Sequence, residues 1–443
     1  MLVALLALSP FAASAQGSRS AADSAQGPRS PADSARPRAR PDSMTTDTIK
    51  AWGELEKDGF LLAKTDRASL NLGLYLLARY INQLPSSETF TDHLGNVRPV
   101  QMRNDIMLHR VQLWLRGFFW DPKFRYEFLA WSVLAIQRTN LIGFLGYDFN
   151  KQISIYAGIS GVPGTRSLLN IAPYFFGTDR FMADDFFRPG FTGGAWLSGE
   201  VLPGVRYKLM VGNSITQVGI LAANLTRDLA TGQTIWWMPT TGEFGPRGAG
   251  AYGDYENHKK VATRIGISHV HSREDRFNQL ADPSPDNTQI RLSDSVLLFE
   301  TGSLAPGVTV QKANYNLTSA DFGVKYRGVH IQTDYFYRWL DGFDTDGPVP
   351  QSHIIDRGVL IQGSAMLVPR RLELLGATSQ IKGQFNNPAE WVAGINIYPG
   401  VGRYPKINVM LLRELFTAAG GTFGYYSGGQ HGTTLTISTD VFF

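Results

Sequence analysis

Hydrophobic and polar residues alternate along most of the chain with a period of two. In residues 70–81, Leu70, Leu72, Leu74 and Leu76 alternate with a second set of positions that includes Arg79. The same alternation recurs near 110–119, 124–128, 153–160, 206–211, 321–327 and 329–338, within segments of about ten residues. Because successive strand residues point to opposite faces, the pattern predicts strands with one apolar and one charged face. About ten residues is the length of a tilted membrane strand.

Three further features favour a transmembrane barrel over a soluble sandwich. Tight turns at 121–122, 150–151 and 203–204 alternate with long connections at 82–104, 163–190 and 216–259. Aromatic residues crowd the strand ends, as outer-membrane barrels require at both lipid interfaces. The chain ends in an amphipathic strand that finishes with Phe443, an ending that resembles the signal read by the barrel-assembly machinery. We therefore expect an all-β fold, a transmembrane antiparallel β-barrel in the outer membrane.

The strand count follows from placing the carboxyl terminus in the periplasm. Fifteen strands are expected near 69–81, 106–119, 123–134, 141–149, 152–162, 191–201, 205–215, 261–272, 320–328, 329–340, 356–368, 371–382, 390–399, 404–414 and 433–443. One more is expected between 273 and 319, at 295–300 or 308–315. Sixteen strands is the prediction, with eighteen as the alternative. A barrel of this size is too wide for side chains to fill and leaves an aqueous channel.

The chain divides into three parts. Residues 1–15 are apolar and end in Ala13-Ser14-Ala15, which predicts a signal peptide cleaved after Ala15. Residues 16–48 are rich in Ser, Ala, Pro and Arg and have too little apolar surface to fold, so a disordered periplasmic segment is expected. Residues 49–443 form the predicted outer-membrane barrel, after a short helix near 49–57.

Composition and motifs argue against catalysis. The 443 residues include no Cys, which excludes disulfides, thiolate zinc sites and a cysteine nucleophile. A net charge of +4 gives no reason to expect a nucleic-acid partner. His269 and His271 share a strand face without a third ligand, and Asp341, Asp344 and Asp346 lack the closing Glu of a calcium loop. We expect no metal, no cofactor and no enzymatic activity.

The polar faces of the predicted strands line the lumen, and this lining favours basic residues. Four acidic residues are assigned to it: Glu127, Asp321, Asp334 and Asp440. The basic residues assigned to the lumen are Arg110, Arg116, Arg125, Arg206, Lys208, Arg264, Lys325, Arg327 and Arg338. An excess of positive charge in a narrow pore concentrates anions. A register error of one residue would exchange the lining and the lipid-facing sets.

The sequence resembles the phosphate-selective porin O and P family. The resemblance covers roughly residues 50–443. It is carried by Asp58–Leu62, Leu108–Gly117, Gly158–Pro163, Tyr326–Gln332 and the terminal Phe443. Its motifs are degenerate and mostly describe barrel construction.

The resemblance implies a homotrimer of sixteen-stranded channels in which the third long loop folds inward as a constriction. Here that loop would be residues 163–189. Arg166, Arg180 and Arg188 in the loop face an equal number of acids, Asp179, Asp184 and Asp185. This balance departs from a strongly basic filter and puts phosphate selectivity in question.

The leading hypothesis is a passive porin for small hydrophilic solutes, with a preference for anions of the phosphate type. An alternative is a barrel without an open pore that anchors the 44-residue loop 216–259, including Trp236 and Trp237, for adhesion or assembly. A third alternative is a barrel enzyme that uses a Ser, a His and an orienting polar residue on the wall.

Overall fold

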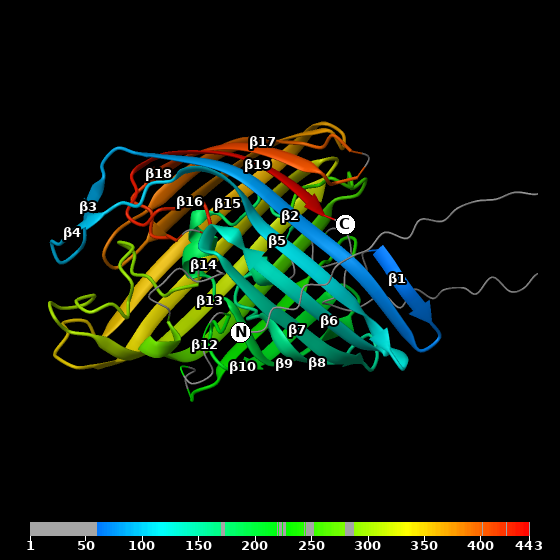
Figure 1. Ribbon diagram of the computed structural model, residues 1–443, viewed down its shortest axis with the longest axis horizontal. Coiled ribbons are helices and arrows are strands. Elements are labelled where there is room, and N and C mark those ends of the chain that lie inside the picture. The colour runs from blue at the N-terminus through cyan, green and yellow to red at the C-terminus, as the bar shows by residue number, and fades with distance from the viewer. Residues whose placement is uncertain are drawn as a thin grey trace, which may run out of the picture. The chain divides into compact units, whose positions relative to one another are not determined.

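Sixteen strands form a closed antiparallel ring in the described part of the computed structural model (Figure 1). The structure describes residues 60–442 except 170–172, 219, 221–223, 225–226, 243, 245–251, 280–287, 401 and 422. The strands of the ring are β2 (Ala68–Pro85), β5 (Asn104–Phe119), β6 (Asp121–Val133), β7 (Arg138–Asp148), β8 (Ser154–Gly161), β9 (Phe191–Leu202), β10 (Val205–Gly212), β11 (Ala230–Trp237), β12 (Ala262–Asp275), β13 (Val310–Tyr326), β14 (Val329–Thr345), β15 (His353–Val368), β16 (Leu372–Lys382), β17 (Ala389–Ile397), β18 (Lys406–Leu415) and β19 (Gly432–Phe442). The predicted fold class and strand count are confirmed.

The ring closes where its last strand pairs with its first. β19 pairs with β2 from Gly432 opposite Pro85 to Phe442 opposite Tyr75. Beyond that point, β1 (Phe60–Thr65) pairs with residues 68–72 of the same strand. β1 and β19 therefore lie on the same edge of β2, one after the other. A small hairpin of β3 (Thr89–Thr91) and β4 (Val97–Pro99) lies outside the ring sheet.

The two ends of the ring differ in their connections. At one end, here called the turn end, tight turns join β5 to β6, β7 to β8, β9 to β10 and β13 to β14. Arg327 and Gly328 make the last of these turns with positive φ at both positions, as a two-residue type I′ hairpin requires. The opposite end, here called the loop end, carries the β3–β4 hairpin and most of the long connections (Figure 1). The long connection from β11 to β12 is the exception and lies at the turn end.

Alternation places apolar side chains outside and polar ones inside. On β2, Tyr75, Leu77 and Arg79 point into the ring and are almost fully buried, whereas the even-numbered residues face outward. The exposed large hydrophobic side chains include Leu145, Leu197, Ile265, Phe322 and Ile331. An outer surface of this kind is stable against lipid, not water. No helix in the described ranges is long and apolar enough to cross a bilayer.

One strand lies elsewhere than predicted. β11 lies inside the predicted loop 216–259, so that stretch is not a single 44-residue loop. Neither candidate between 273 and 319 forms an extra strand. Residues 295–300 are mainly turn, with one isolated bridge, and 308–315 overlap the start of β13. The total remains sixteen because the unplaced strand is β11.

The interior of the ring is a packed core made largely of connections. The connection from β8 to β9 contains the 3₁₀ turn η2 (Arg166–Leu168) and the short helix α1 (Met182–Phe187), and all of its described residues are buried. Phe176, Phe187, Leu292, Val296 and Tyr425, from three connections, belong to one buried cluster inside the ring. The predicted inward loop is confirmed. Two further short 3₁₀ turns, η1 (Leu134–Ile136) and η4 (Arg276–Asn278), follow β6 and β12.

Several sequence predictions lie outside the described residues. These are the signal peptide (1–15), the Ser/Ala/Pro/Arg-rich segment (16–48), the short helix (49–57) and the terminal Phe443.

Candidate functional site

Seven of the nine predicted lumen cations lie fully inside the ring. Their side chains are buried on strands that alternate as predicted: Arg110, Arg116, Arg125, Lys208, Arg264, Lys325 and Arg338. Arg206 also faces inward but is less buried, with its Nε 3.4 Å from Glu200 Oε2. Arg327 is different, because it lies exposed in the turn between β13 and β14. The alternation of β13 ends at Tyr326, one residue before it.

The lumen carries as many buried acids as bases, which corrects the predicted basic excess. The described ring strands bury nine basic side chains: Arg79, Arg110, Arg116, Arg125, Lys208, Arg264, Lys325, Arg338 and Lys406. They bury ten acidic ones: Asp148, Glu200, Glu274, Asp321, Asp334, Asp356, Glu373, Glu390, Glu414 and Asp440. The predicted set lacks Arg79, Lys406 and seven of these acids. The same alternation could have found them, since Glu373, for example, lies between Leu372 and Leu374.

Many of the lumen cations lie against carboxylates of the neighbouring strand. Arg264 Nε lies 2.7 Å from Asp321 Oδ1, and Arg338 Nη2 lies 2.7 Å from Asp356 Oδ2. The Nε atoms of Arg116 and Arg125 lie 3.4 and 3.5 Å from Glu127 Oε2 and Asp148 Oδ2. A charge removed from water must be paired or hydrogen-bonded, so these pairs allow the wall to be charged and buried together.

The segment of residues 162–190, called here the inward segment, is fastened to the wall on two sides. On one side, Asp179 forms ion pairs with Arg79 of β2, at 3.0 Å, and with Arg110 of β5. Further round the ring, the backbone N–H of Met182 donates to Glu390 Oε1 of β17 at 2.7 Å, and that of Ala183 donates to Ser379 Oγ of β16 at 3.2 Å. β16 and β17 lie eight positions round the ring from β8 and β9, the two strands that the inward segment connects. The inward segment therefore crosses the lumen.

The three arginines of the inward segment make their contacts inside the ring. Arg166 donates to Gln332 of β14. Arg180 Nε donates to Ser167 Oγ at 3.0 Å, and Arg188 Nη2 lies 3.0 Å from Asp185 Oδ1. Burial, together with the nearby charge of Arg188, lowers the pKa of Arg180 to about 10. That group still keeps its proton at neutral pH.

Asp179 of the inward segment contacts two wall arginines, Arg79 and Arg110. Burial alone would raise its pKa, but the guanidinium groups of Arg110 and Arg79 outweigh burial and lower the pKa of Asp179 below the ordinary value. Asp179 is therefore ionised at neutral pH, and one negative charge is shared by two positive ones.

A second connection enters the ring from the turn end. It joins β11 to β12 and its buried residues include Phe244 and Tyr252. The backbone N–H of Tyr252 donates to the carbonyl of Tyr174 in the inward segment at 2.8 Å. The ring of Tyr252 stacks on Phe176 at 5.2 Å between centroids. The two connections thus meet inside the lumen.

This second connection also covers cations of the lumen. The guanidinium of Arg166 lies 4.5 Å from the ring centroid of Tyr252 and 5.0 Å from that of Phe244, within cation–π range. Lys325 Nζ lies 4.9 Å from the Phe244 centroid. The backbone N–H of Gly253 donates to His330 Nδ1 at 2.8 Å. Sequence reasoning misses this connection, because the pattern predicts one long loop over 216–259 at the opposite end of the barrel.

The two remaining motifs are on the wall. Trp236 and Trp237 belong to β11, where Trp236 is buried inside the ring and Trp237 is exposed outside, rather than to a long loop. His269 and His271 both face outward on β12, and their Nδ1 atoms are hydrogen-bonded to Thr318 at 2.9 Å and Asn316 at 2.7 Å.

Comparison with known proteins supports the fold. No protein-family model matches the sequence, and no curated protein matches it. The resemblance to the phosphate-selective porin O and P family therefore stays a prediction. Among solved structures, outer-membrane expressed OmpT of Vibrio cholerae is 9% identical with a TM-score of 0.53, over 86% of this chain and 99% of that one.

Two more structures agree with it. A trimer form of in-vitro folded OmpT from Vibrio cholerae is 9% identical with a TM-score of 0.52, covering 85% of this chain and all of that one. The anion-selective porin from Comamonas acidovorans is 10% identical with a TM-score of 0.50, again covering 85% of this chain and all of that one. This chain is an antiparallel β-barrel of sixteen strands with the fold of the porins.

Proposed function

We propose that the chain is an outer-membrane porin for small hydrophilic solutes, with a preference for anions that arises where the inward segment meets the wall. The observation that carries the proposal is the position of Asp179 between Arg79 and Arg110. The overall balance of buried charge argues against a filter that is basic throughout. A local excess of one positive charge at this junction favours a modest anion preference over strict phosphate selectivity.

The charges at this junction predict two opposite changes in ion selectivity. Arg110→Gln removes the excess positive charge, whereas Asp179→Asn exposes both arginines to a passing ion. We expect the ratio of anion to cation permeability to fall about two- to fivefold in the first variant and to rise by a similar factor in the second. Reversal potentials in planar bilayers under a salt gradient measure both.

The matched control is Arg413→Gln, which removes a cation from the exposed outer face of β18. It should leave the reversal potential unchanged. A wild-type barrel that selects cations, or two variants that shift in the same direction, would contradict the proposed origin of the preference.

The proposal includes a homotrimer with its carboxyl terminus in the periplasm, inserted by the barrel-assembly machinery. The wall supports it because β8, β10 and β11 have only eight residues each, whereas β13 and β14 have seventeen. Strands of eight residues are short for crossing the hydrocarbon layer. This side of the wall is therefore better suited to contact with neighbouring copies than with lipid. Cross-linking across β8 and β10 tests it.

A second candidate is a barrel without a steady open pore. It is favoured by the contact of Tyr252 with Tyr174 and Phe176, and by the burial of every described residue of the inward segment. The alternative in which the barrel anchors a 44-residue loop is not supported in that form, because β11 occupies part of residues 216–259. An absence of conductance steps from folded protein in a bilayer would favour this candidate over the porin.

A further inference from the structure

On the outer wall formed by β14, β15 and β16, the outward side chains change from apolar to polar and charged about nine residues from the turn end. On β14 the outward side chains begin with Val329, Ile331 and Tyr335, and reach Tyr337 after about the length that a tilted strand needs to cross a bilayer. Tyrosine is enriched at the interface between hydrocarbon and headgroups. The level of Tyr337 is therefore the level of lipid headgroups at the loop end.

Two cations lie side by side at this level. Arg357 of β15 is directly opposite Lys382 of β16 in the antiparallel ladder, and both are exposed on the outer face. Like charges directly opposite each other destabilise a sheet pair. Neither side chain forms an ion pair with any residue in the described ranges. An external anion bound between the two cations would reduce their mutual repulsion.

The two cations line a groove suited to a small anionic group. The groove has a volume of about 440 Å³, and Gln380 and Asn387 add amide groups to its lining. None of the described residues that line it is acidic. The guanidinium of Arg357 lies 5.4 Å from the ring centroid of Tyr337, which keeps it against the wall beside the groove.

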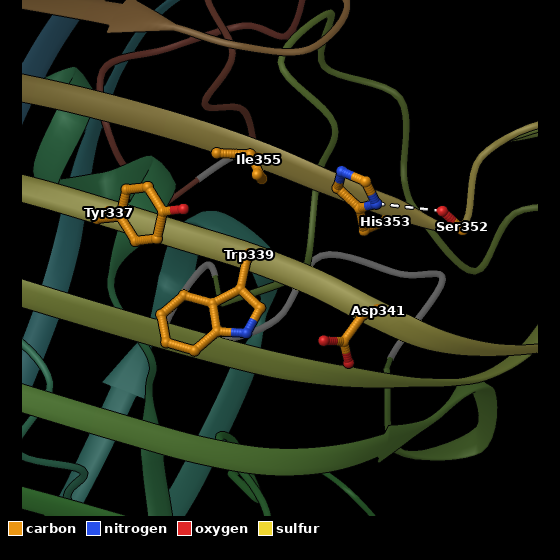
Figure 2. A pocket seen from close by; sticks show the side chains of 6 residues that line it. All are labelled: Tyr337, Trp339, Asp341, Ser352, His353 and Ile355. Carbon is orange, nitrogen blue, oxygen red and sulfur yellow. Dashed lines mark hydrogen bonds between the residues drawn. The ribbon is translucent and has the colours of Figure 1, made fainter.

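Beyond the groove, the wall becomes polar. A neighbouring hollow is lined by Trp339, Asp341, Ser352 and His353, with Ser352 Oγ 3.1 Å from His353 Nδ1. Figure 2 shows Tyr337, Trp339 and Asp341 along one strand, with His353 and Ile355 on the next. A carboxylate on the outer face is unsuited to hydrocarbon. The Arg357–Lys382 pair therefore lies between the apolar belt and the water-exposed part of the wall.

We propose that Arg357 and Lys382 bind the phosphate of an anionic lipid headgroup in the outer leaflet. The acyl chains of the lipid would lie against the exposed apolar side chains below the pair, including Ile361 and Trp391. The orientation of the barrel comes from the proposed function, but the site does not require an open pore. A lipid fits better than a soluble anion, since the apolar belt adjoins the charges directly.

The test uses the full chain refolded in vesicles with equal parts of phosphatidylcholine and phosphatidylglycerol. The barrel is then extracted gently, and its retained lipids are counted by native mass spectrometry. Wild type should retain phosphatidylglycerol in preference. Arg357→Gln and Lys382→Gln should each reduce that preference about fivefold, the effect expected of one cation at an anionic surface.

The charge reversal Lys382→Glu gives a second, independent readout. It should abolish the preference for phosphatidylglycerol and, by pairing with Arg357, raise the urea midpoint in vesicles of phosphatidylcholine alone. Arg413→Gln on β18 is the matched control and should retain the wild-type preference. Equal retention in wild type and both glutamine variants, or an equal loss in Arg413→Gln, would overturn the site. Neither readout measures conductance. A barrel that lacks an open pore would therefore contradict the proposed porin function but not the lipid site.

Discussion

Replacing Arg338 with methionine is expected to lower the free energy of unfolding of the barrel by about 3–5 kcal/mol. Arg338 Nη2 is 2.7 Å from Asp356 Oδ2, and both side chains are almost completely buried. The same nitrogen donates to the carbonyl of Arg291 at 2.8 Å, and Nη1 donates to that of Phe186 at 3.4 Å. The substitution leaves Asp356 charged and buried without its cation. Urea titration in vesicles, followed by tryptophan fluorescence, measures the loss.

Two further variants separate charge pairing from general damage. Arg338→Met combined with Asp356→Leu removes both charges and should recover much of the stability, because an apolar pair does not carry the desolvation cost of ions. Arg327→Gln removes an exposed arginine from a turn and should change stability by less than about 0.5 kcal/mol. A loss below about 1 kcal/mol in Arg338→Met would show that the pair contributes little.

Truncating Tyr252 is expected to raise single-channel conductance by about twofold or more, since apolar constrictions limit ion passage. Its ring packs against both Phe176, at 5.2 Å, and His330, at 6.0 Å, where the two inward-folding connections meet. Tyr252→Ala removes this ring and leaves both the Tyr252 N–H bond to Tyr174 and the Gly253 N–H bond to His330 available. Planar-bilayer recordings in symmetric salt measure the step size.

Trp391→Ala provides the control, because Trp391 is a large aromatic residue exposed on the outer wall. Its step size should match wild type. If both Tyr252→Ala and the double variant with Phe244→Ala keep the wild-type step, the meeting of the two connections does not limit the path.

The strands could be predicted wherever the outward residues are apolar. β2 and β14 alternate clearly because lipid faces one side and charge the other. β11 was missed because its outward Thr231 and Gln233 are polar, while its inward Ala230 and Gly232 are small. Such a strand has little contrast between its faces. The predicted count was right, although one strand was assigned to the wrong region.

The candidate site was harder to predict than the fold. Alternation identifies which side chains enter the lumen, but it does not show that Asp179 contacts Arg79 and Arg110. Asp179 and Arg79 are 100 positions apart in the sequence. The contact of Tyr252 with Tyr174 depends on a connection entering from the turn end, where short turns were expected. These contacts arise from tertiary placement of irregular segments, which have no periodicity to read.

Closure of the ring determines the order in which the barrel can fold. Tyr75 of β2 contacts Asp440 of β19, which is 365 positions away in the sequence. Most other strand pairs of the ring join strands that follow each other in the sequence. Pairing of chain segments so far apart carries the largest loop-closure entropy and forms slowly. Until β19 arrives, the free edge of β2 remains open to pairing with other chains. The β1 hairpin shields part of that edge early, because only two residues separate it from β2.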